Sequence, residues 1–574
     1  MPFLITESRR QTGAGRLLDV PGAALEVAVQ PEFAGAFADA WRRHARALAA
    51  AVGWPDVALA VCPFPGGVSL ALAAPVDGLY AATELNEAAA ALASADAAGA
   101  PADGDAGDAA DAVTRVLARI ERDRDPALVA LLAAAAGHGV SALWDADAVT
   151  LGLGAGSRTW PADALPGADA VDWHALRDVP VALVTGTNGK STTVRMLAAM
   201  ATAAGHVPGV STTDYVSVGR DLIEAGDFSG PMGARAALRD RRATLGVLEV
   251  ARGGLLRRGV PVTRAAVACV TNVASDHLGE YGVETVEALA GVKFVVAKAL
   301  AAGGVLVLSA DDAHSAAEAD RQAAALARRG VAVGWCSLDP SGPRLAGAPV
   351  AASVVGGQIA VRRGGGAWAA LVAVADAPSA MGGAAVHNVR NALSAVATGA
   401  ALGLPDAALA AGLRAFRGDA ADNPGRANVS AVRGATVVVD YAHNTHGLAA
   451  LVAFAEHLPC PGRRLVLLST AGDRADADIC DMARVARTFR ADRTLAADLP
   501  DYLRGRAPGE VPAIIARETA ALGAPPASVA TFPDPASAAR DALAWAAPGD
   551  VLLLVVLSHR AEVAALVRDA AAGA

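Results

Sequence analysis

Cysteine is scarce in this 574-residue sequence, which contains only five cysteines. They are odd in number, they are scattered, and no two of them are spaced as C-x-x-C. Such a set favours neither a disulfide-bonded secreted domain nor a structural zinc site. We therefore expect a reducing environment and a cytoplasmic location.

Long apolar runs and long basic runs are also missing. No stretch reaches the roughly eighteen strongly apolar residues that a membrane helix needs. The N-terminal segment lacks the basic-then-apolar order of a secretory signal. The net charge is −9, and no Lys/Arg run is long enough to follow a phosphate backbone. We expect neither a membrane nor a nucleic acid as a partner.

The length is enough for several domains, and the sequence patterns divide into three blocks. The first, residues 1–175, mixes short strands with helices and predicts an α+β domain. Ala88–Ala112 is almost entirely Ala, Asp and Gly and is interrupted by Pro101, which predicts a loop or linker. The other expected elements of this block are helices over Phe33–Val52, Ala112–Arg122 and Asp125–Gly137 and strands over Val57–Cys62 and Gly67–Ala73.

The second and third blocks, residues 176–403 and 404–574, alternate strand and helix patterns, as in α/β domains with parallel sheets. We expect a larger central domain, a smaller Rossmann-like C-terminal domain and a hinge near residues 403–406. The expected central strands are Val181–Thr185, Leu245–Val250, Ala266–Thr271, Gly304–Ser309 and Val331–Cys336, with a β excursion over 350–375 and a helix over His387–Leu402. The expected C-terminal strands are Thr436–Asp440, Arg464–Ser469 and Asp550–Leu557.

The segment from Val181 to Ala204 is typical of a phosphate loop. A strand, Val181–Thr185, leads into a glycine-rich turn and then a helical run. Such a turn directs backbone N–H groups and the positive end of a helix at one point, which suits a phosphate. Lys190 could reach the β- and γ-phosphates, and Ser191 could hold Mg²⁺. Val184 replaces the first glycine of the usual pattern, so this is a shortened variant; the alternative is a glycine-rich turn with an incidental lysine.

Further candidate ligands follow two other strands of the central block. Glu249 ends one strand, where a carboxylate can complete a Mg²⁺ shell. Asn272, Asp276 and His277 follow the next strand, and an imidazole and a carboxylate there could hold a second cation. The alternative for His277 is a loop histidine with ordinary partners. Lys293 lies in the helical run Val286–Leu300, where spacing alone favours a surface charge.

Together these residues resemble the Mur ligase superfamily, whose ATP-dependent amide ligases include the peptidoglycan-precursor ligases and the folylpolyglutamate synthetases. Within it, the likeness is strongest to the C-terminal ligase half of the cyanophycin synthetase family. The motifs that carry the resemblance are Gly186–Thr192, Glu249, Thr271–His277, Lys293 and Asp440–Asn444, supported by Ser211–Asp214, Asn423–Arg426 and Leu503–Glu510.

The resemblance implies a role for each matched residue. Lys190, Glu249, His277 and Lys293 would be catalytic, with Ser191 and Glu249 on one Mg²⁺, His277 on a second, and a carbamylated Lys293. The nucleotide would be bound by Gly186, Thr187, Asn188, Gly189, Lys190, Ser191, Thr192, Asn388, Asn391, Arg426, Asp440 and His443. The substrate would be faced by Thr212, Thr213, Asp214 and Arg252.

One departure from the cyanophycin synthetase pattern concerns a whole module. In that family an ATP-grasp module, which supplies the aspartate-adding step, lies between the N-terminal domain and the ligase half. Here Leu151–Arg158 resembles the tail of the N-terminal domain, and the chain reaches the first ligase strand too soon to leave room for it. We expect that this chain alone does not build cyanophycin, and that a separate ATP-grasp enzyme is a partner. Relatives often form homo-oligomers.

Three functions remain open from the sequence. The first is an amide ligase that joins an amino acid or similar amine to a carboxylate, with an aspartyl β-carboxylate as the family-based choice. The second is a non-catalytic partner of a separate ATP-grasp enzyme. The third is a phosphotransferase acting on a small alcohol. Tyr215, Met232 and Gly233 depart from the family pattern in the acceptor region and leave the substrate open, whereas Thr445 replaces a proline in a turn.

Overall fold

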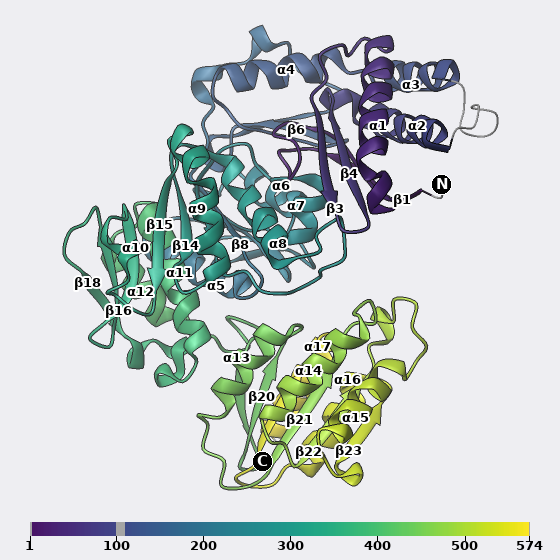
Figure 1. Cartoon of the computed structure of the whole chain (residues 1–574). Coiled ribbons are helices and arrows are strands. Elements are labelled where there is room, and N and C mark those ends of the chain that lie inside the picture. Colours follow the sequence, from purple (N-terminus) through teal and green to yellow (C-terminus); the bar gives the residue numbers. More distant parts are fainter. Residues whose placement is uncertain (1–2, 99–108, 573–574) are drawn as a thin grey trace.

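The computed structural model describes residues 3–98 and 109–572 (Figure 1). Within these ranges the strands form an 11-stranded, a 6-stranded, a 4-stranded and a 3-stranded sheet. The mixed α/β class with parallel central and C-terminal sheets confirms the expected fold class. No helix in the described ranges is long and apolar enough to cross a membrane.

The N-terminal part packs helices on an antiparallel sheet of order β1-β2-β4-β3. Trp41 lies fully buried between them, and its indole Nε1 donates to Asn86 Oδ1 at 2.9 Å. A small second sheet, β5-β6-β7, follows. The elements are β1 Leu4–Gln11, β2 Gly22–Ala28, α1 Pro31–Ala51, β3 Leu59–Phe64, β4 Gly67–Ala73, α2 Leu79–Ala98, α3 Ala109–Asp123, α4 Pro126–Gly137, β5 Ala142–Trp144, β6 Ala148–Leu151 and β7 Arg158–Pro161.

The loop predicted over Ala88–Ala112 is wrong at both of its described ends. Helix α2 continues to Ala98, and helix α3 already begins at Ala109. Ala89, Ala90 and Ala93 are fully buried against the helices and sheet of this part, and alanine is a strong helix former. The small side chains therefore pack tightly where the composition alone suggested a linker. Residues 99–108, with Pro101, lie outside the described residues.

The central sheet has the order β11-β10-β9-β12-β8-β13-β14-β15-β16-β17-β18. Its middle strands are parallel: Glu249 of β12 lies opposite Val184 of β8, and Val270 of β13 lies opposite Thr185. The loops after β12, β8 and β13 therefore meet at one edge of the sheet. The strands are β8 Val181–Thr185, β9 Pro208–Ser211, β10 Tyr215–Val218, β11 Asp221–Ala225, β12 Leu245–Glu249, β13 Ala265–Val270, β14 Leu300–Ser309, β15 Ala332–Ser337, β16 Val350–Val355, β17 Gln358–Arg363 and β18 Ala369–Ala373.

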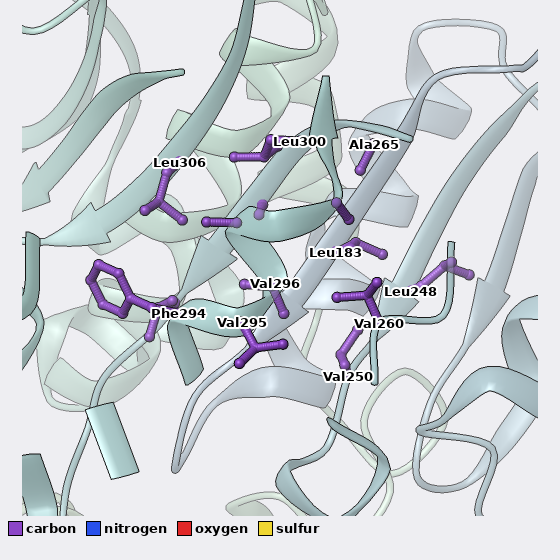
Figure 2. Close-up of a cluster of buried hydrophobic side chains, with 14 of the residues drawn as sticks. Leu183, Leu248, Val250, Val260, Ala265, Phe294, Val295, Val296, Leu300 and Leu306 are labelled. Carbon is purple, nitrogen blue, oxygen red and sulfur yellow. The ribbon is translucent and has the colours of Figure 1, made fainter. Parts of the chain in front are cut away.

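Helices cover both faces of this sheet. Figure 2 shows the core on one face, where Leu183 and Leu248 from the strands pack near Val295 and Val296. The helix predicted over Val286–Leu300 is shorter than expected. The α-helix ends at Lys293, and a 3₁₀ helix then leads into β14. The helices are α5 Lys190–Ala203, α6 Pro231–Arg239, α7 Arg252–Arg258, α8 Val286–Lys293, α9 Ala313–Arg328, α10 Pro343–Ala346, α11 Val386–Ala401 and α12 Asp406–Ala415.

The C-terminal sheet has the order β19-β20-β24-β21-β22-β23 and forms a separate lobe (Figure 1). Its strands are parallel apart from β19, and β24 is fully buried. The elements are β19 Asn428–Val432, β20 Ala435–Asp440, α13 Thr445–Ala455, β21 Arg464–Ser469, α14 Asp476–Thr488, β22 Arg493–Ala497, α15 Glu510–Ala521, β23 Val529–Phe532, α16 Pro535–Trp545, β24 Val551–Val555 and α17 Arg560–Ala572.

Helix α12 belongs to the core of the central sheet, although the predicted domain boundary places it in the C-terminal block. Its Leu409 and Leu413 are buried with Leu197 and Met200 of α5. A Cβ on Gly412 would lie only 2.6 Å from the Cα of Met200, so the two helices touch backbone to backbone. This packing favours a boundary between Phe416 and the start of β19, beyond the predicted hinge.

The close approach at Gly412 predicts a stability effect of unusual sign. Gly412→Ala should destabilise the central part by about 1–3 kcal/mol, because overpacking outweighs the better helix propensity of alanine. The matched change Gly35→Ala in α1, where a Cβ meets nothing within 4 Å, should be neutral or stabilise by up to about 1 kcal/mol. Calorimetric unfolding of both variants measures the difference; equal shifts would contradict the packing of α12 on α5.

Candidate active site

A cavity of about 2470 Å³ lies where the N-terminal, central and C-terminal parts meet. Its walls include the phosphate loop, the loops after β12 and β13, and the turn between β20 and α13. The predicted residues that line it are Thr187, Asn188, Gly189, Lys190, Ser191, Thr192, Thr213, Glu249, Arg252, His277, Lys293, Asn388, Asn391, Arg426, Asp440 and His443. Residues separated by up to about half of the chain are thus brought to one cavity.

Two glycines allow the phosphate loop to pack closely on its neighbours. Gly186 has φ 145°, and a Cβ there would lie 1.9 Å from Thr271 Oγ1. Gly189 has φ 82°, and a Cβ there would lie 2.1 Å from Asn391 Oδ1. A side chain at either position would clash and would strain the backbone. The loop then runs directly into α5 at Lys190, so that the N-terminus of this helix faces the cavity.

Glu249 and Ser191 present hard oxygen atoms beside this loop. Glu249 is 1% exposed, and its carboxylate accepts from the Thr213 hydroxyl at 2.7 Å and from the Thr213 N–H at 3.2 Å. Ser191, the second residue of α5, is 5% exposed and lines the same cavity. Carboxylate and hydroxyl oxygens suit Mg²⁺. The donor set fits one divalent cation here, and Thr213 orients the carboxylate.

Lys293 is buried under the phosphate loop and is not a surface charge. It is 3% exposed, and its Nζ donates to the carbonyl oxygen of Gly186 at 2.9 Å. Burial, reinforced by the charge of nearby Lys190, lowers the pKa of Lys293 well below its usual range. Lys190 itself donates to the Thr187 carbonyl at 3.0 Å. An amine of lowered pKa beside a phosphate-binding loop is a typical sign of a functional site.

His277 is surrounded by charged groups and has a strained backbone, with φ 50°. Arg474, in the loop after β21, donates from one Nη2 to His277 Nε2 at 3.2 Å and to Asp276 Oδ1 at 2.9 Å. Burial opposes ionisation of Asp276, but His443, 3.6 Å from its carboxylate, and the charges of His277 and Arg474 hold its pKa well below the ordinary range. A guanidinium therefore lies on the atoms that a second cation would need.

The donor set at His277 does not fit a second metal ion in this arrangement. The described ranges, 3–98 and 109–572, contain no group of three or more His, Cys, Asp or Glu side chains able to hold one. Sequence reasoning missed Arg474, although a signal existed. It follows a buried strand of the C-terminal sheet within Ala471-Gly-Asp-Arg474, just as Glu249 ends a strand of the central sheet.

The residues predicted to face the substrate separate into two groups. Thr213 and Arg252 line the cavity, whereas Thr212 and Asp214 do not. Thr212 is fully buried, and its hydroxyl accepts from the N–H groups of Asp214 and Tyr215 at 3.1 Å. Thr212 therefore shapes a turn. Arg252 is 8% exposed and donates to Glu280 Oε2 at 2.8 Å.

Asp214 joins the central part to the C-terminal lobe. Its carboxylate is paired with Arg195 of α5 and with Arg560 at the start of α17, the latter at 2.6 Å. Burial opposes ionisation of Asp214, but Arg560, Arg426 and Arg195 together lower its pKa. Arg560 and Arg426 both lie near the ring of Tyr441, at 4.9 and 4.4 Å from its centre. The predicted substrate ligand is thus a bridge between lobes.

A second bridge reaches the phosphate loop itself. The side-chain amides of Asn188 and Asn444 bond to each other in both directions at 3.1 Å, and Asn444 also caps α13. Asn391 donates to Asn388 at 3.2 Å on the buried face of α11. Burial raises the pKa of Asp440, which accepts from the Ala427 N–H at 2.6 Å. The C-terminal lobe is therefore docked on the predicted nucleotide side.

The bridge at Asp214 predicts how the lobes respond to mutation. Arg560→Met removes the ion pair that, among the described residues, joins α17 to the central part, and it should increase the fraction of open molecules. Small-angle X-ray scattering should then report a larger radius of gyration. Arg568→Met, an exposed change on the same helix, is the matched control and should leave the scattering unchanged. Identical curves for both variants would show that Asp214 does not hold the lobes together.

Comparisons with known proteins agree with this geometry. Residues 184–399 match the Mur ligase middle domain, and residues 425–555 match the Mur ligase, glutamate ligase domain. The cyanophycin synthetase of Synechocystis sp. is 35% identical over 344 residues, 59% of this chain and 38% of that protein. This chain thus spans well under half the length of the cyanophycin synthetases that it matches.

Two further related proteins are matched over most of their own length. The UDP-N-acetylmuramate–L-alanine ligase of Kineococcus radiotolerans is 32% identical over 373 residues, 64% of this chain and 70% of that ligase. The solved structure of E. coli FolC in complex with ADP shares the fold, with a TM-score of 0.51 and 21% identity over 69% of this chain and 90% of FolC. The chain belongs to the Mur ligase family of ATP-dependent amide ligases.

Proposed function

We propose that this chain activates a carboxylate with ATP and joins it to an amine. The γ-phosphoryl group of ATP would pass to a carboxylate oxygen to give an acyl phosphate and ADP. The amine nitrogen would then attack the acyl carbon, phosphate would leave, and the amine would lose a proton. The observation that carries this proposal is the convergence of Lys190, Glu249 and buried Lys293 on one phosphate loop, under a docked second lobe.

The chain's own residues would mainly position and neutralise the phosphates. The loop N–H groups and the α5 N-terminus would bind the phosphate oxygens, and Lys190 would turn from the Thr187 carbonyl toward them. Ser191 and Glu249 would hold one Mg²⁺, which supplies positive charge for phosphoryl transfer. Arg426, Asp440 and His443 would act from the C-terminal lobe, with Asn388 and Asn391 beside the nucleotide.

Docking of the C-terminal lobe would protect the activated carboxylate. An acyl phosphate is hydrolysed by water, so the reaction needs a site from which water is excluded. The bridges Asn188–Asn444 and Asp214–Arg560 connect the lobe to the central part. Neither activation nor amide formation requires a covalent bond to the protein.

The substrates are proposed from the relatives. The names of two relatives, UDP-N-acetylmuramate–L-alanine ligase and UDP-N-acetylmuramoylalanine–D-glutamate ligase, include an amino acid, so we propose an amino acid as the amine and an amino acid or peptide carboxylate, an aspartyl β-carboxyl among them. From the family resemblance we also propose a separate ATP-grasp enzyme as a partner and a homo-oligomeric state. The non-catalytic alternative is disfavoured because the loop, Glu249 and Lys293 are intact.

Lys293 is further proposed to be carbamylated. Its buried amine has a lowered pKa, so the neutral form needed for addition to CO₂ is favoured near neutral pH. The carbamate would carry a negative charge between Lys190 and the cation held by Glu249. That charge would replace the unfavourable approach of two lysines by an attractive contact.

Loss of the phosphate-loop lysine tests the proposed reaction. With ATP, Mg²⁺ and panels of amino acids and dipeptides, the wild-type chain should release ADP and phosphate and form an amide visible by mass spectrometry. Lys190→Ala should lower this rate by about 10²-fold or more. Lys298→Ala, which removes the one lysine outside the site, should not. A phosphorylated alcohol as the product, or no release with any pair of substrates, would refute an amide ligase.

Carbamylation is measured separately from activity. With ¹³C-bicarbonate near neutral pH, a carbamate ¹³C signal should appear in the wild type and in Lys298→Arg but not in Lys293→Arg. Because protonation of the Lys293 amine competes with carbamate formation, the signal should fall as the pH is lowered through its depressed pKa. A signal that persists in Lys293→Arg would assign the modification elsewhere, and no signal in the wild type would refute it.

A further inference from the structure

Arg474 occupies the place in which the sequence predicted a second cation. Its guanidinium is 12% exposed and lies on the carboxylate of Asp276, which is 11% exposed, and on Nε2 of His277. The other ring nitrogen of His277 lies 3.9 Å from Glu280, whose remaining partner is Arg252. Asp276 Oδ1 and His277 Nε2, the atoms that a cation here would use first, therefore already face a guanidinium.

The loop that carries Arg474 is built to hold it there. Gly472 approaches the neighbouring loop so closely that a Cβ would lie 2.1 Å from the Leu503 carbonyl oxygen. Arg506 donates to two carbonyl groups of the Arg474 loop, those of Gly472 at 2.8 Å and of Arg474 at 2.7 Å. Arg506 is itself paired with Asp476 and Glu510. The position of Arg474 thus depends on two fixed contacts of its own lobe.

A fixed guanidinium at this point disfavours a divalent cation on the same atoms. Asp276 is almost enclosed and already pairs with Arg474, so a cation on the same carboxylate would be repelled by the guanidinium. Phosphoryl transfer develops negative charge on several oxygens, and the two residues that hold Arg474, Asp276 and His277, line the cavity in which the phosphates would bind. A guanidinium can neutralise that charge and can donate to two oxygens at once.

We infer that Arg474 takes the place of the second divalent cation, so that the chain uses one divalent cation for each bound nucleotide. The inference rests on the proposed function. Arg474 arrives with the C-terminal lobe, so closure of the lobe delivers the charge. His277 and Asp276, which line the cavity, then hold Arg474 and do not bind metal.

Counting bound manganese tests this inference without turnover. The full chain is titrated with Mn²⁺ at a saturating concentration of a non-hydrolysable ATP analogue, and free Mn²⁺ is measured by electron paramagnetic resonance. We expect one nucleotide-dependent Mn²⁺ per chain, and the same number in His277→Ala. Two Mn²⁺ per chain, falling to one in His277→Ala, would overturn the inference and leave the proposed function standing. No nucleotide-dependent Mn²⁺ would overturn both.

The charge of Arg474 is tested by a pair of variants. Arg474→Met should lower phosphate release by at least about 10²-fold, and Arg474→Lys, which keeps the charge, should recover part of that loss. Arg484→Met in α14, a half-exposed arginine outside the cavity, is the matched control and should be unaffected. Equal rates for Arg474→Met and the wild type would contradict a role for this guanidinium.

Discussion

The parallel register of three central strands is the constraint on which the site depends. With β8 between β12 and β13, the strand ends at Glu249, Thr185 and Val270 stand side by side, and the loops that follow them must share one edge of the sheet. Parallel strands present all their carboxyl ends on the same side, so three separate segments supply one site. A shift of one residue in β12 would turn Glu249 away from the phosphate loop.

Close backbone packing makes this edge rigid. The absence of side chains at Gly186 and Gly189 lets the loop pack directly on Thr271 and Asn391. The Nζ of Lys293 donates a hydrogen bond to the carbonyl oxygen of Gly186 in the same loop. The cost is a buried amine near a second lysine, and both burial and that charge lower the pKa of Lys293. The same packing that orders the loop therefore also perturbs the titration of Lys293.

Charged side chains join the lobes at two places. Asp214 pairs with arginines from both lobes, and Arg474 enters from the C-terminal lobe to meet Asp276 and His277. Such contacts are directional and can be exchanged for contacts to a charged ligand, as a moving lobe requires. Apolar contact also crosses the boundary, because Ala385 of the central part is buried with Val438 and Leu448 of the C-terminal lobe. Helix α12 is the clearest example of an element that follows its core and not its place in the sequence.

Local patterns in the sequence determined the order of strands and helices, the phosphate loop and the strand-end position of Glu249, because these depend on neighbouring residues. Burial of Lys293, the turn role of Thr212, the bridging role of Asp214 and the entry of Arg474 were decided only by the tertiary structure. Spacing along a helix cannot tell a surface lysine from one that lies under another loop. Nor can a carboxylate in a loop reveal which arginines, more than three hundred residues away in the case of Arg560, will reach it. Those outcomes depend on how the two lobes meet, and no short segment of the chain contains that information.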